Sequence, residues 1–329
     1  MFFTNNNTVN PEPGVIVGPI ANVFGFILDA IYNVFYAISS SLALGLSIIF
    51  FTFIVRLLIL PLGIKQQKHA ISMRKLQPDI QKINKKYEGR NEMSDKQAKT
   101  AEIQKLYADK KVNPFAGCLP ALIQWPIFIT LFSMFRSPYA YITRLRDAYL
   151  SIINQMVTYE NWAEPINRTL SLGYNRVTLP FNMNEPNDLT RLIFTYSIED
   201  WQTYFAQIPS QFVPALESLI NSVRGMETFL GIDMVSAVFF NWPAVLLPIL
   251  AAASSFLTSR VMMKSSPVDK DAPGAALQKP MMYMMPVMMG FITFVSPGAL
   301  GVYWIASNLF HLIQIVVLEK KYAPKEGIS

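Results

Sequence analysis

The run LALGLSIIFFTFIVRLLILPLGI, residues Leu42–Ile64, decides the fold of this chain. It is almost entirely apolar, and its 23 residues would extend about 35 Å as a helix, enough to cross the hydrocarbon core of a bilayer. Its one charged residue, Arg56, would lie about 12 Å inside the Ile64 end by the same rise per residue. An arginine stays protonated, and placing one at the centre of a membrane helix costs about 2.5–3.5 kcal/mol. Arg56 therefore needs water, a partner or a functional reason to be there.

The overall composition predicts an integral membrane protein. Of the 329 residues, 52% are hydrophobic and 15% are charged, whereas soluble domains have about 25% charged residues. The single cysteine, Cys118, excludes an intramolecular disulfide. Two interpretations of Arg56 stay open at this point. Its guanidinium extends to the lipid headgroups, or it faces a polar cavity inside the membrane.

Five apolar runs are candidates for membrane spans. They are Leu42–Ile64, Phe115–Phe135, Val235–Leu257, Met281–Val295 and Leu300–Leu318. The fourth run is short for a span, and the turn at Ser296-Pro297-Gly298 ties it to the fifth as a hairpin. A fourth segment that re-enters the membrane without crossing it is the alternative.

The distribution of lysine orients these spans. Residues Lys65–Val112 carry 13 Lys or Arg and 6 Asp or Glu, whereas Arg136–Asp233 carry 7 arginines, 10 acidic residues and no lysine. Residues 1–41 have no Lys or Arg, and the tail 319–329 carries three lysines. Since cytoplasmic loops are enriched in Lys and Arg, we expect the N-terminus outside and the C-terminus in the cytoplasm. The net charge of +6 then reflects topology and a basic face suited to anionic lipids or ribosomal RNA, with no specific nucleic acid as partner.

Two segments outside the spans have helical patterns. Residues 1–41 are expected to form an extracytoplasmic lead-in and a helix at about 20–38, where an apolar stripe excludes Asn22, Asp29 and Asn33. We interpret it as an interfacial helix, with a sixth span as the alternative.

Residues 65–112 are predicted to form a cytoplasmic helical hairpin or a solvated spacer. Its apolar residues recur at steps of three and four, and Ser94 with Gln97 suggests a capping box for the second helix. These seam residues are Met73, Leu76, Ile80, Ile83, Tyr87, Ile103 and Tyr107.

The remaining boundaries follow from these segments. The domain plan has spans at 42–64, 113–135 and 234–258, and a fourth and fifth span paired at 281–318. Between them lie an extracytoplasmic loop domain at 136–233 and a cytoplasmic loop at 259–280, with a cytoplasmic tail at 319–329. The loop domain is too long for a plain connection, and Tyr141–Val157 and Pro214–Leu230 within it have the pattern of amphipathic helices.

Polar residues within the spans point to an internal polar surface. Trp304, Asn308, His311 and Gln314 recur at steps of four and three, so with Ser307 they share one face of a helix, and Gln124 lies in the second span. Hydrogen bonding between helices is the alternative role, and for Gln124 alone it is the favoured one. None of the five spans contains Asp or Glu, so no carboxylate within them can pair with Arg56. Together with Arg56, the stripe favours a hydrated cavity.

Four motifs in this order resemble the YidC/Oxa/Alb family of membrane protein insertases. They are FIVRLLILPLGIKQQKH (53–69), LQPDIQKINKKY (76–87), NPFAGCLPALIQWPIFITLF (113–132) and GVYWIASNLFHLIQ (301–314). The resemblance implies an all-α integral membrane protein with five transmembrane helices around a hydrophilic groove. The groove would open to the cytoplasm and to lipid, with an amphipathic helix on the outer surface. It assigns Arg56 as the groove arginine. It makes Gln124, Trp304, Asn308, His311 and Gln314 candidates to line the substrate path, although the family pattern leads us to expect a small polar residue at the position of His311.

The resemblance implies an insertase and chaperone for nascent membrane proteins, with no enzymatic activity, no catalytic residues, no metal and no cofactor. The ribosome and a Sec translocon would be further partners, and a bacterial plasma membrane is the expected location. A small-anion transporter or channel is the alternative, in which Arg56 would select the anion. No inverted repeat supports that alternative, and a membrane enzyme would need an acid–base pair or metal set that the spans lack.

Overall fold

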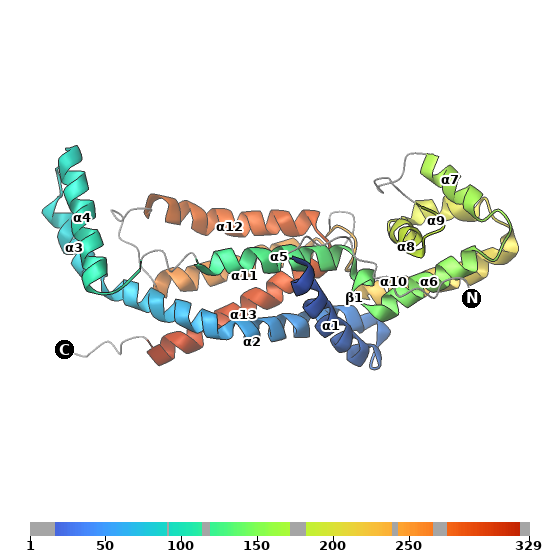
Figure 1. Ribbon diagram of the computed structural model, residues 1–329, viewed down its shortest axis with the longest axis horizontal. Helices are drawn as coiled ribbons and strands as arrows, with labels where there is room; N and C mark the ends of the chain where they lie inside the picture. The colour runs from blue at the N-terminus through green and yellow to red at the C-terminus, as the bar shows by residue number, and fades with distance from the viewer. Residues whose placement is uncertain are drawn as a thin grey trace. The chain divides into compact units, whose positions relative to one another are not determined.

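The computed structural model describes residues 17–90, 92–113, 119–171, 182–238, 243–265 and 275–322, which are mainly α-helical (Figure 1). The expectations for the N-terminal lead-in, Cys118, the middle of the 259–280 loop and the end of the tail lie outside these residues. The helices are α1 (Val17–Tyr36), α2 (Ser40–Lys75), α3 (Gln77–Lys86), α4 (Met93–Asp109), α5 (Leu119–Arg136), α6 (Thr143–Met156), α7 (Ala163–Ser171), α8 (Pro186–Phe194), α9 (Ile198–Phe205), α10 (Val213–Glu227), α11 (Leu246–Ser265), α12 (Ala275–Val295) and α13 (Gly298–Tyr322). Strands β1 (Thr228–Phe229) and β2 (Ile232–Asp233) form a short antiparallel hairpin.

The chain divides into two compact units. The first combines Met1–Ser47 with Thr130–Val235, and the second combines Ile48–Ile129 with Ser236–Ser329. The first unit therefore contains α1, α6 to α10 and the β-hairpin, together with the first two turns of α2 and the last two turns of α5. The second unit contains the remainder of α2 and α5, the helices α3 and α4, and α11 to α13.

Several helices have the dimensions of membrane spans. Within the described ranges, three helical segments are long and apolar enough to cross a bilayer: Gly18–Tyr36, Ser40–Lys86 and Gly298–Tyr322. Two shorter apolar helical segments, Leu246–Met262 and Tyr283–Val295, belong to α11 and α12. The architecture is thus that of an all-α membrane protein. Since α12 starts at Ala275, the fourth predicted span belongs to a helix of 21 residues.

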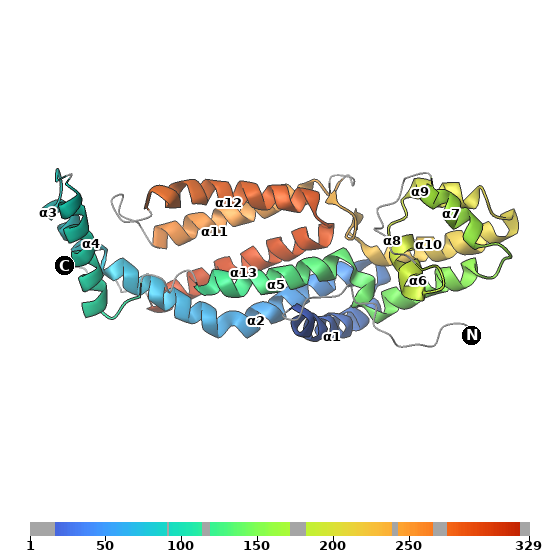
Figure 2. The same cartoon turned by 45° about the horizontal axis from the view of Figure 1, so that its top comes forward.

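Three helices pack together in the second unit. Figures 1 and 2 show α11 beside both α12 and α13, in agreement with the contacts between these helices. The third predicted span starts later than expected, because α11 begins at Leu246 and not at Val235. Before it, Ala237 pairs with Pro297 as an isolated β-bridge, so this backbone bonds to the α12–α13 turn instead of continuing a helix.

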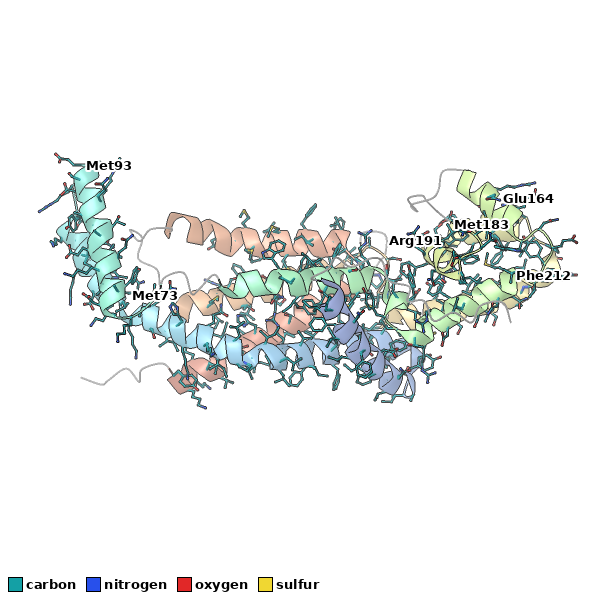
Figure 3. The ribbon with its side chains drawn as sticks, in the orientation of Figure 1. Met73, Met93, Glu164, Met183, Arg191 and Phe212 are labelled. Carbon is teal, nitrogen blue, oxygen red and sulfur yellow. The ribbon has the colours of Figure 1, made fainter. Side chains whose placement is uncertain are left out.

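Helices α3 and α4 form an antiparallel hairpin within the second unit. Leu76, Ile80 and Ile103 are its buried contact, so the residues spaced at three and four do face the partner helix. Figure 3 shows Met73 at the base of this hairpin and Met93 at its tip. Pro78 lies in the first turn of α3, where its missing N–H is tolerated.

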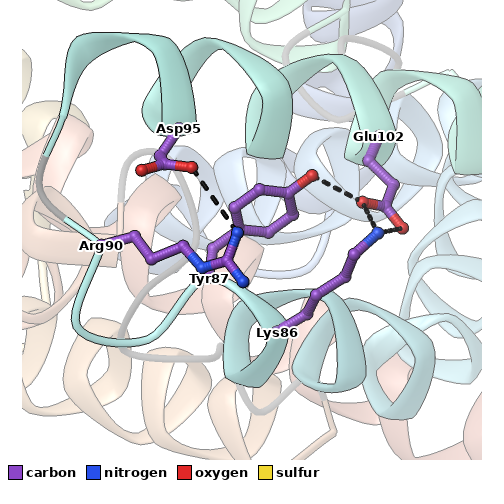
Figure 4. A network of polar contacts seen from close by, with 5 residues as sticks. All are labelled: Lys86, Tyr87, Arg90, Asp95 and Glu102. Atoms are coloured by element: carbon purple, nitrogen blue, oxygen red, sulfur yellow. Dashed lines mark hydrogen bonds and ion pairs between the residues drawn. The ribbon is translucent and has the colours of Figure 1, made fainter.

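Polar contacts extend the same seam to the hairpin tip. Figure 4 shows Glu102 accepting hydrogen bonds from Lys86 (2.8 Å) and from the Tyr87 hydroxyl (3.0 Å). Nearer the tip, Arg90 lies 3.8 Å from Asp95. The predicted capping box at Ser94 is wrong. Helix α4 starts at Met93 with Glu92 at the N-cap, so Ser94 already lies inside the helix and its hydroxyl donates to Glu92.

The first unit is organised around α6 and α10, which lie side by side (Figures 1 and 2). Both were expected as amphipathic helices, and their apolar faces are buried. The buried side chains include Leu145, Tyr149, Ile152 and Ile153 of α6 and Leu216, Ile220 and Val223 of α10. The β-hairpin follows α10 directly, and its Phe229 ring lies over Gly45 of α2, where a Cβ atom would clash with the ring. Glycine is needed there for the approach of the hairpin to the helix.

Helix α1 is attached to the start of α6 through its polar edge. The backbone N–H of Thr143 donates to Asp29 Oδ1 (2.8 Å), and the Thr143 hydroxyl donates to Asp29 Oδ2 (3.2 Å). A carboxylate at a helix N-terminus accepts a hydrogen bond that the helix itself cannot provide, and it interacts favourably with the helix dipole. Arg144 adds a second link, because its Nε donates to Asn33 Oδ1 at 2.6 Å.

Candidate functional site

A small cleft in the second unit contains Arg56. Its volume is about 60 Å³, which is room for a few water molecules. Side chains from α2, α5 and α13 line it, although these helices are far apart in the sequence. The lining residues are Arg56, Ile59, Leu62, Gly63, Gln66, Gln124, Ile127, His311 and Gln314. Four of the six predicted site residues, Arg56, Gln124, His311 and Gln314, are therefore brought together.

The guanidinium of Arg56 is held by a serine from the last helix. Arg56 Nε donates to Ser307 Oγ at 2.8 Å, and Arg56 Nη2 donates to the same oxygen. Ser307 is only 2% exposed, so its hydroxyl has a fixed position between the helices. These bonds use the side of the guanidinium formed by Nε and Nη2. Arginine can bind a carboxylate through two parallel hydrogen bonds at either of two edges of its guanidinium. The second of these edges, formed by Nη1 and Nη2, is not the one that faces Ser307.

Gln314 lies against Gly63 of α2, where there is no side chain to occupy the space. Its amide lies so close to Gly63 that a Cβ atom at this position would clash with it. Gly63 and Gln66 both lie on the face of α2 that carries Arg56, since four of the five lining positions on this helix, 56, 59, 63 and 66, are separated by three or four residues. The cleft thus combines one cation with the amides of Gln66, Gln124 and Gln314.

The other two predicted residues occupy different surroundings. Trp304 is buried, and its ring stacks on Phe128 of α5 with centroids 5.9 Å apart and an angle of 9° between the planes. Asn308 faces α11, where its Nδ2 donates to Ser254 Oγ at 3.1 Å and its backbone carbonyl oxygen accepts from Thr258 Oγ1 at 3.4 Å. Neither residue lines the cleft, and Asn308 forms the kind of hydrogen bond between helices that was the alternative role for these polar residues.

Sequence reasoning missed two polar parts of this site. Ser307 was placed on the polar face of the fifth span but was not among the candidates, and Gln66 was not considered at all. The spacing from Arg56 could have identified Gln66, because it lies ten residues on and therefore near the same helical face. Nothing local indicates that Ser307, 251 residues away in the sequence, is the hydrogen-bond partner of Arg56.

The residues of the cleft suit binding better than acid–base chemistry. Arg56 is the permanently charged side chain among the lining residues, and no carboxylate is among them. In the parts of the chain that the structure describes, no group of three or more His, Cys, Asp and Glu could hold a metal ion. What the arrangement offers is a fixed cation with neutral donors and acceptors beside it, which is suited to an acidic or polar chain segment.

Comparison with known proteins places the chain in a family. The model of the family described as "60Kd inner membrane protein" matches residues 34–199 and 201–326. A membrane protein insertase YidC of Clostridium perfringens is 27% identical over 319 residues, which cover 94% of this chain and 95% of that protein. Insertases of the same name from Oceanobacillus iheyensis and Fusobacterium nucleatum are 26% and 27% identical, over 86% and 85% of this chain and 77% and 87% of their own lengths.

Proposed function

We propose that this chain, which belongs to the 60Kd inner membrane protein family, inserts other proteins into a lipid bilayer. The relatives reported above are all named membrane protein insertases, and the similarity extends over most of their length. None of these three is named as a transporter, so the alternative of a small-anion transporter gains no support from them. The observation that carries the proposal for the site is the Arg56 guanidinium, held by Ser307 beside a cleft lined with amides.

The cleft is proposed to receive an acidic side chain from the leading polar segment of a nascent membrane protein, in place of the few water molecules for which it has room. An acidic side chain of that segment would bind the edge of the Arg56 guanidinium that Ser307 does not occupy. Gln66, Gln124 and Gln314 would offer hydrogen bonds to its backbone. These replace part of the hydration that a polar segment loses on leaving water, and so lower the cost of bringing it into the membrane.

Release would then proceed along α5 and α13 into lipid. Burying apolar surface contributes about 25 cal/mol per Å², so transfer of a hydrophobic helix drives the step without a nucleotide. The sequence contains no phosphate-binding loop motif, which is consistent with this source of energy. The stacked rings of Trp304 and Phe128 place aromatic surface between α13 and α5, on the proposed path.

The proposed membrane arrangement has five spans. Helices α2 and α13 supply the first and fifth, and α5, α11 and α12 supply the others, with lengths of 18, 20 and 21 residues. The lysine distribution supports a cytoplasmic side that carries the α3–α4 hairpin and the C-terminal tail, with the helices α6 to α10 outside. A cleft open to this cytoplasmic side would be open to water and to the incoming chain.

Helix α1 is proposed to lie along the outer surface of the membrane. Its length and hydropathy also fit a span. However, Asp29 and Asn33 bind the start of α6, and Tyr36 lies under the Arg144 guanidinium, so two turns of α1 carry a polar edge. An aspartate is costly inside a bilayer, and an amphipathic helix with one polar edge is typical of the interface.

Further partners are proposed on the cytoplasmic side. The α3–α4 hairpin carries exposed lysines at both ends, including Lys82, Lys85 and Lys110, which suit ribosomal RNA or anionic lipids. The hairpin would receive the substrate before the cleft does. A Sec translocon is a further proposed partner, on the resemblance alone.

The test is insertion by the purified chain in liposomes of a single-span protein with an acidic N-terminal tail, measured as protease protection of that tail. We expect protection with the intact chain, loss to the level of empty liposomes with Arg56→Ala and a partial signal with Arg56→Lys, because lysine keeps the charge but lacks the planar fork. Arg168→Ala, at an exposed position of helix α7, is the matched control.

A second substrate, with its acidic tail residues replaced by Asn and Gln, separates the two parts of the proposal. Equal insertion of the acidic tail by Arg56→Ala and by the intact chain would exclude the role of the cleft charge. No insertion of either substrate by the intact chain would contradict the insertase function itself.

A further inference from the structure

A second groove, in the first unit, contains charges of both signs. It has a volume of about 280 Å³ and lies between α6 and α10 at the end of α1. Arg144, Asp147 and Ser151 of α6 contribute to one side, and Ser222 of α10 to the other. These four side chains are exposed at the rim, whereas Met226 at the base is buried. The groove is therefore accessible, polar at its edge and apolar at its floor.

Arg144 is fixed in an unusual position for an exposed arginine. Its Nε donates to Asn33 Oδ1 at 2.6 Å, and its guanidinium carbon lies 4.8 Å from the centroid of the Tyr36 ring. Stacking on an aromatic ring and one hydrogen bond restrict the side chain, so less conformational entropy is lost when it binds an anion. The bond to Asn33 does not use the two Nη groups, which carry four of the five N–H donors of the guanidinium.

With α1 along the outer surface of the membrane, as proposed above, its faces would place this arginine at the level of the lipid headgroups. One stripe of α1, with Ala21, Leu28 and Tyr32, is buried in the unit. A second stripe remains exposed although it is apolar, with Val23 at 59% and Phe26 at 78% exposure. At about 100° per residue, the edge that carries Asp29, Asn33 and Tyr36 lies roughly 90° from both stripes. Residues bound to this edge therefore lie at the boundary between the lipid-facing surface and water.

We propose that this groove binds the headgroup of an amine-bearing phospholipid from the outer leaflet. The phosphate would bind Arg144, with the hydroxyls of Ser151 and Ser222 as further donors. The amine would bind the carboxylate of Asp147, which lies one turn from Arg144 on α6. Asp147 also lies 3.9 Å from Arg146 Nε, a solvent-exposed pair of the kind that contributes little. A purely anionic headgroup would bring its charge close to Asp147, so the charge pattern favours a zwitterion.

The size of the groove limits what can occupy it. Sites that enclose a whole drug-sized ligand have volumes of about 300–1,000 Å³, so 280 Å³ is enough for a headgroup and not for the acyl chains. The exposed apolar stripe of α1, with Val23, Phe26 and Val34, offers a surface for those chains. The headgroup site would thus fix the first unit, of which α1 is a part, to one lipid layer. It does not depend on the insertase activity proposed above.

The experiment measures lipid binding to the purified full-length chain in detergent by native mass spectrometry. The probes are short-chain phosphatidylethanolamine, short-chain phosphatidylglycerol, free phosphoethanolamine and inorganic phosphate. We expect phosphatidylethanolamine to bind at least tenfold more tightly than each of the other three. Equal binding of free phosphoethanolamine or of phosphate would contradict a lipid site, since the acyl chains would then contribute nothing.

Variants test whether the groove is the site. We expect Arg144→Gln to weaken phosphatidylethanolamine binding at least tenfold, and Asp147→Asn to remove the preference over phosphatidylglycerol. Arg168→Gln, which changes the same charge on α7, is the matched control and should bind as the intact chain does. Because Arg144→Gln also removes the bond to Asn33, Ser222→Trp provides a second variant, which fills the groove from α10. Unchanged binding by both Arg144→Gln and Ser222→Trp would overturn the proposal.

Discussion

Glu227 in the first unit is buried and Arg56 in the second is half-buried, and the two regions accommodate these ionisable groups in opposite ways. Glu227 ends α10, is only 6% exposed and accepts a hydrogen bond of 2.6 Å from the Tyr149 hydroxyl. Burial raises the pKa of Glu227 to about 8, although the bond from Tyr149 opposes this shift. Arg56 faces a cleft lined with amides and is bonded to Ser307.

The difference follows from the chemistry of the two side chains. A carboxyl group can become neutral when it is buried, and a protonated Glu227 needs only hydrogen bonds, so it can serve as part of a packed core. A guanidinium cannot lose its proton under these conditions, so the fold must keep polar partners or water beside it. We infer that the first unit accommodates Glu227 as a neutral part of its core, whereas the second unit keeps a charge ready for a ligand.

The largest effect is expected from a substitution that places a charge at the buried position of Glu227. Glu227→Lys would place a cation where the fold accommodates a neutral group, and an unpaired buried charge destabilises by about 3–5 kcal/mol. We expect a strong loss in the thermal unfolding temperature of the purified chain and faster hydrogen exchange in α6 and α10. Glu227→Gln keeps the shape without the charge and is the matched control. An unfolding temperature equal to that of the intact chain in Glu227→Lys would show that the site is not closed to water.

The second effect is a dependence of stability on pH that originates at Glu227. Below about pH 4.5 the carboxyl is protonated in both the folded and the unfolded chain. Between that pH and about 8 the folded chain keeps the proton while the unfolded chain loses it, so the free energy of unfolding falls as pH rises. The loss amounts to a few kcal/mol once pH exceeds the folded pKa.

This contribution can be isolated by thermal unfolding of the intact chain and of Glu227→Gln between pH 4 and 9. The difference between their unfolding free energies should change through this window and level off above it. Tyr149, Asp233, Arg224 and Tyr32 interact with Glu227, so all four are kept unchanged. A difference that is constant across this range would contradict the raised pKa.

The smallest effect is expected from a substitution of Ser307, which tests how the second unit holds Arg56. Ser307→Ala removes both hydrogen bonds to the guanidinium, and a hydrogen bond to a charged group contributes about 1.5–3 kcal/mol. We expect insertion of an acidic-tailed substrate to fall about tenfold while the neutral-tailed substrate is unaffected. Ser307→Thr, which keeps the hydroxyl, should restore most of the activity. Equal losses for both substrates would indicate a general packing role instead.

The sequence predicted the residues that line the cleft better than the hydrogen-bond partners of those residues. Arg56, Gln124, His311 and Gln314 were expected to meet, because charged and polar residues in long apolar runs must point inward. Asn308 shows the limit of that reasoning. It shares a broad helical face with Gln314, yet six residues separate the two by about 120° around the helix, which is enough for one to face α11 and the other the cleft.

The first unit was less accessible to sequence reasoning. Its helices at α6 and α10 were expected from their apolar periodicity, but Glu227 resembles any other charge at a helix end until the β-hairpin and α6 cover it. The capping box at Ser94 failed for a related reason. Several residues at this turn could cap a helix, and only the path of the chain decides that Glu92 occupies the N-cap.

The sequence by itself determined that this is a helical membrane protein, which residues can cross a bilayer and that one of them, Arg56, retains a charge within a span. These properties depend on local length, hydropathy and the pKa of guanidinium. The tertiary structure alone decided that Ser307 holds Arg56 across 251 residues, that Glu227 is buried against Tyr149, and that Asn33 and Tyr36 of α1 fix Arg144. Such contacts join distant segments, and a local pattern of residue types carries no information about which of them meet.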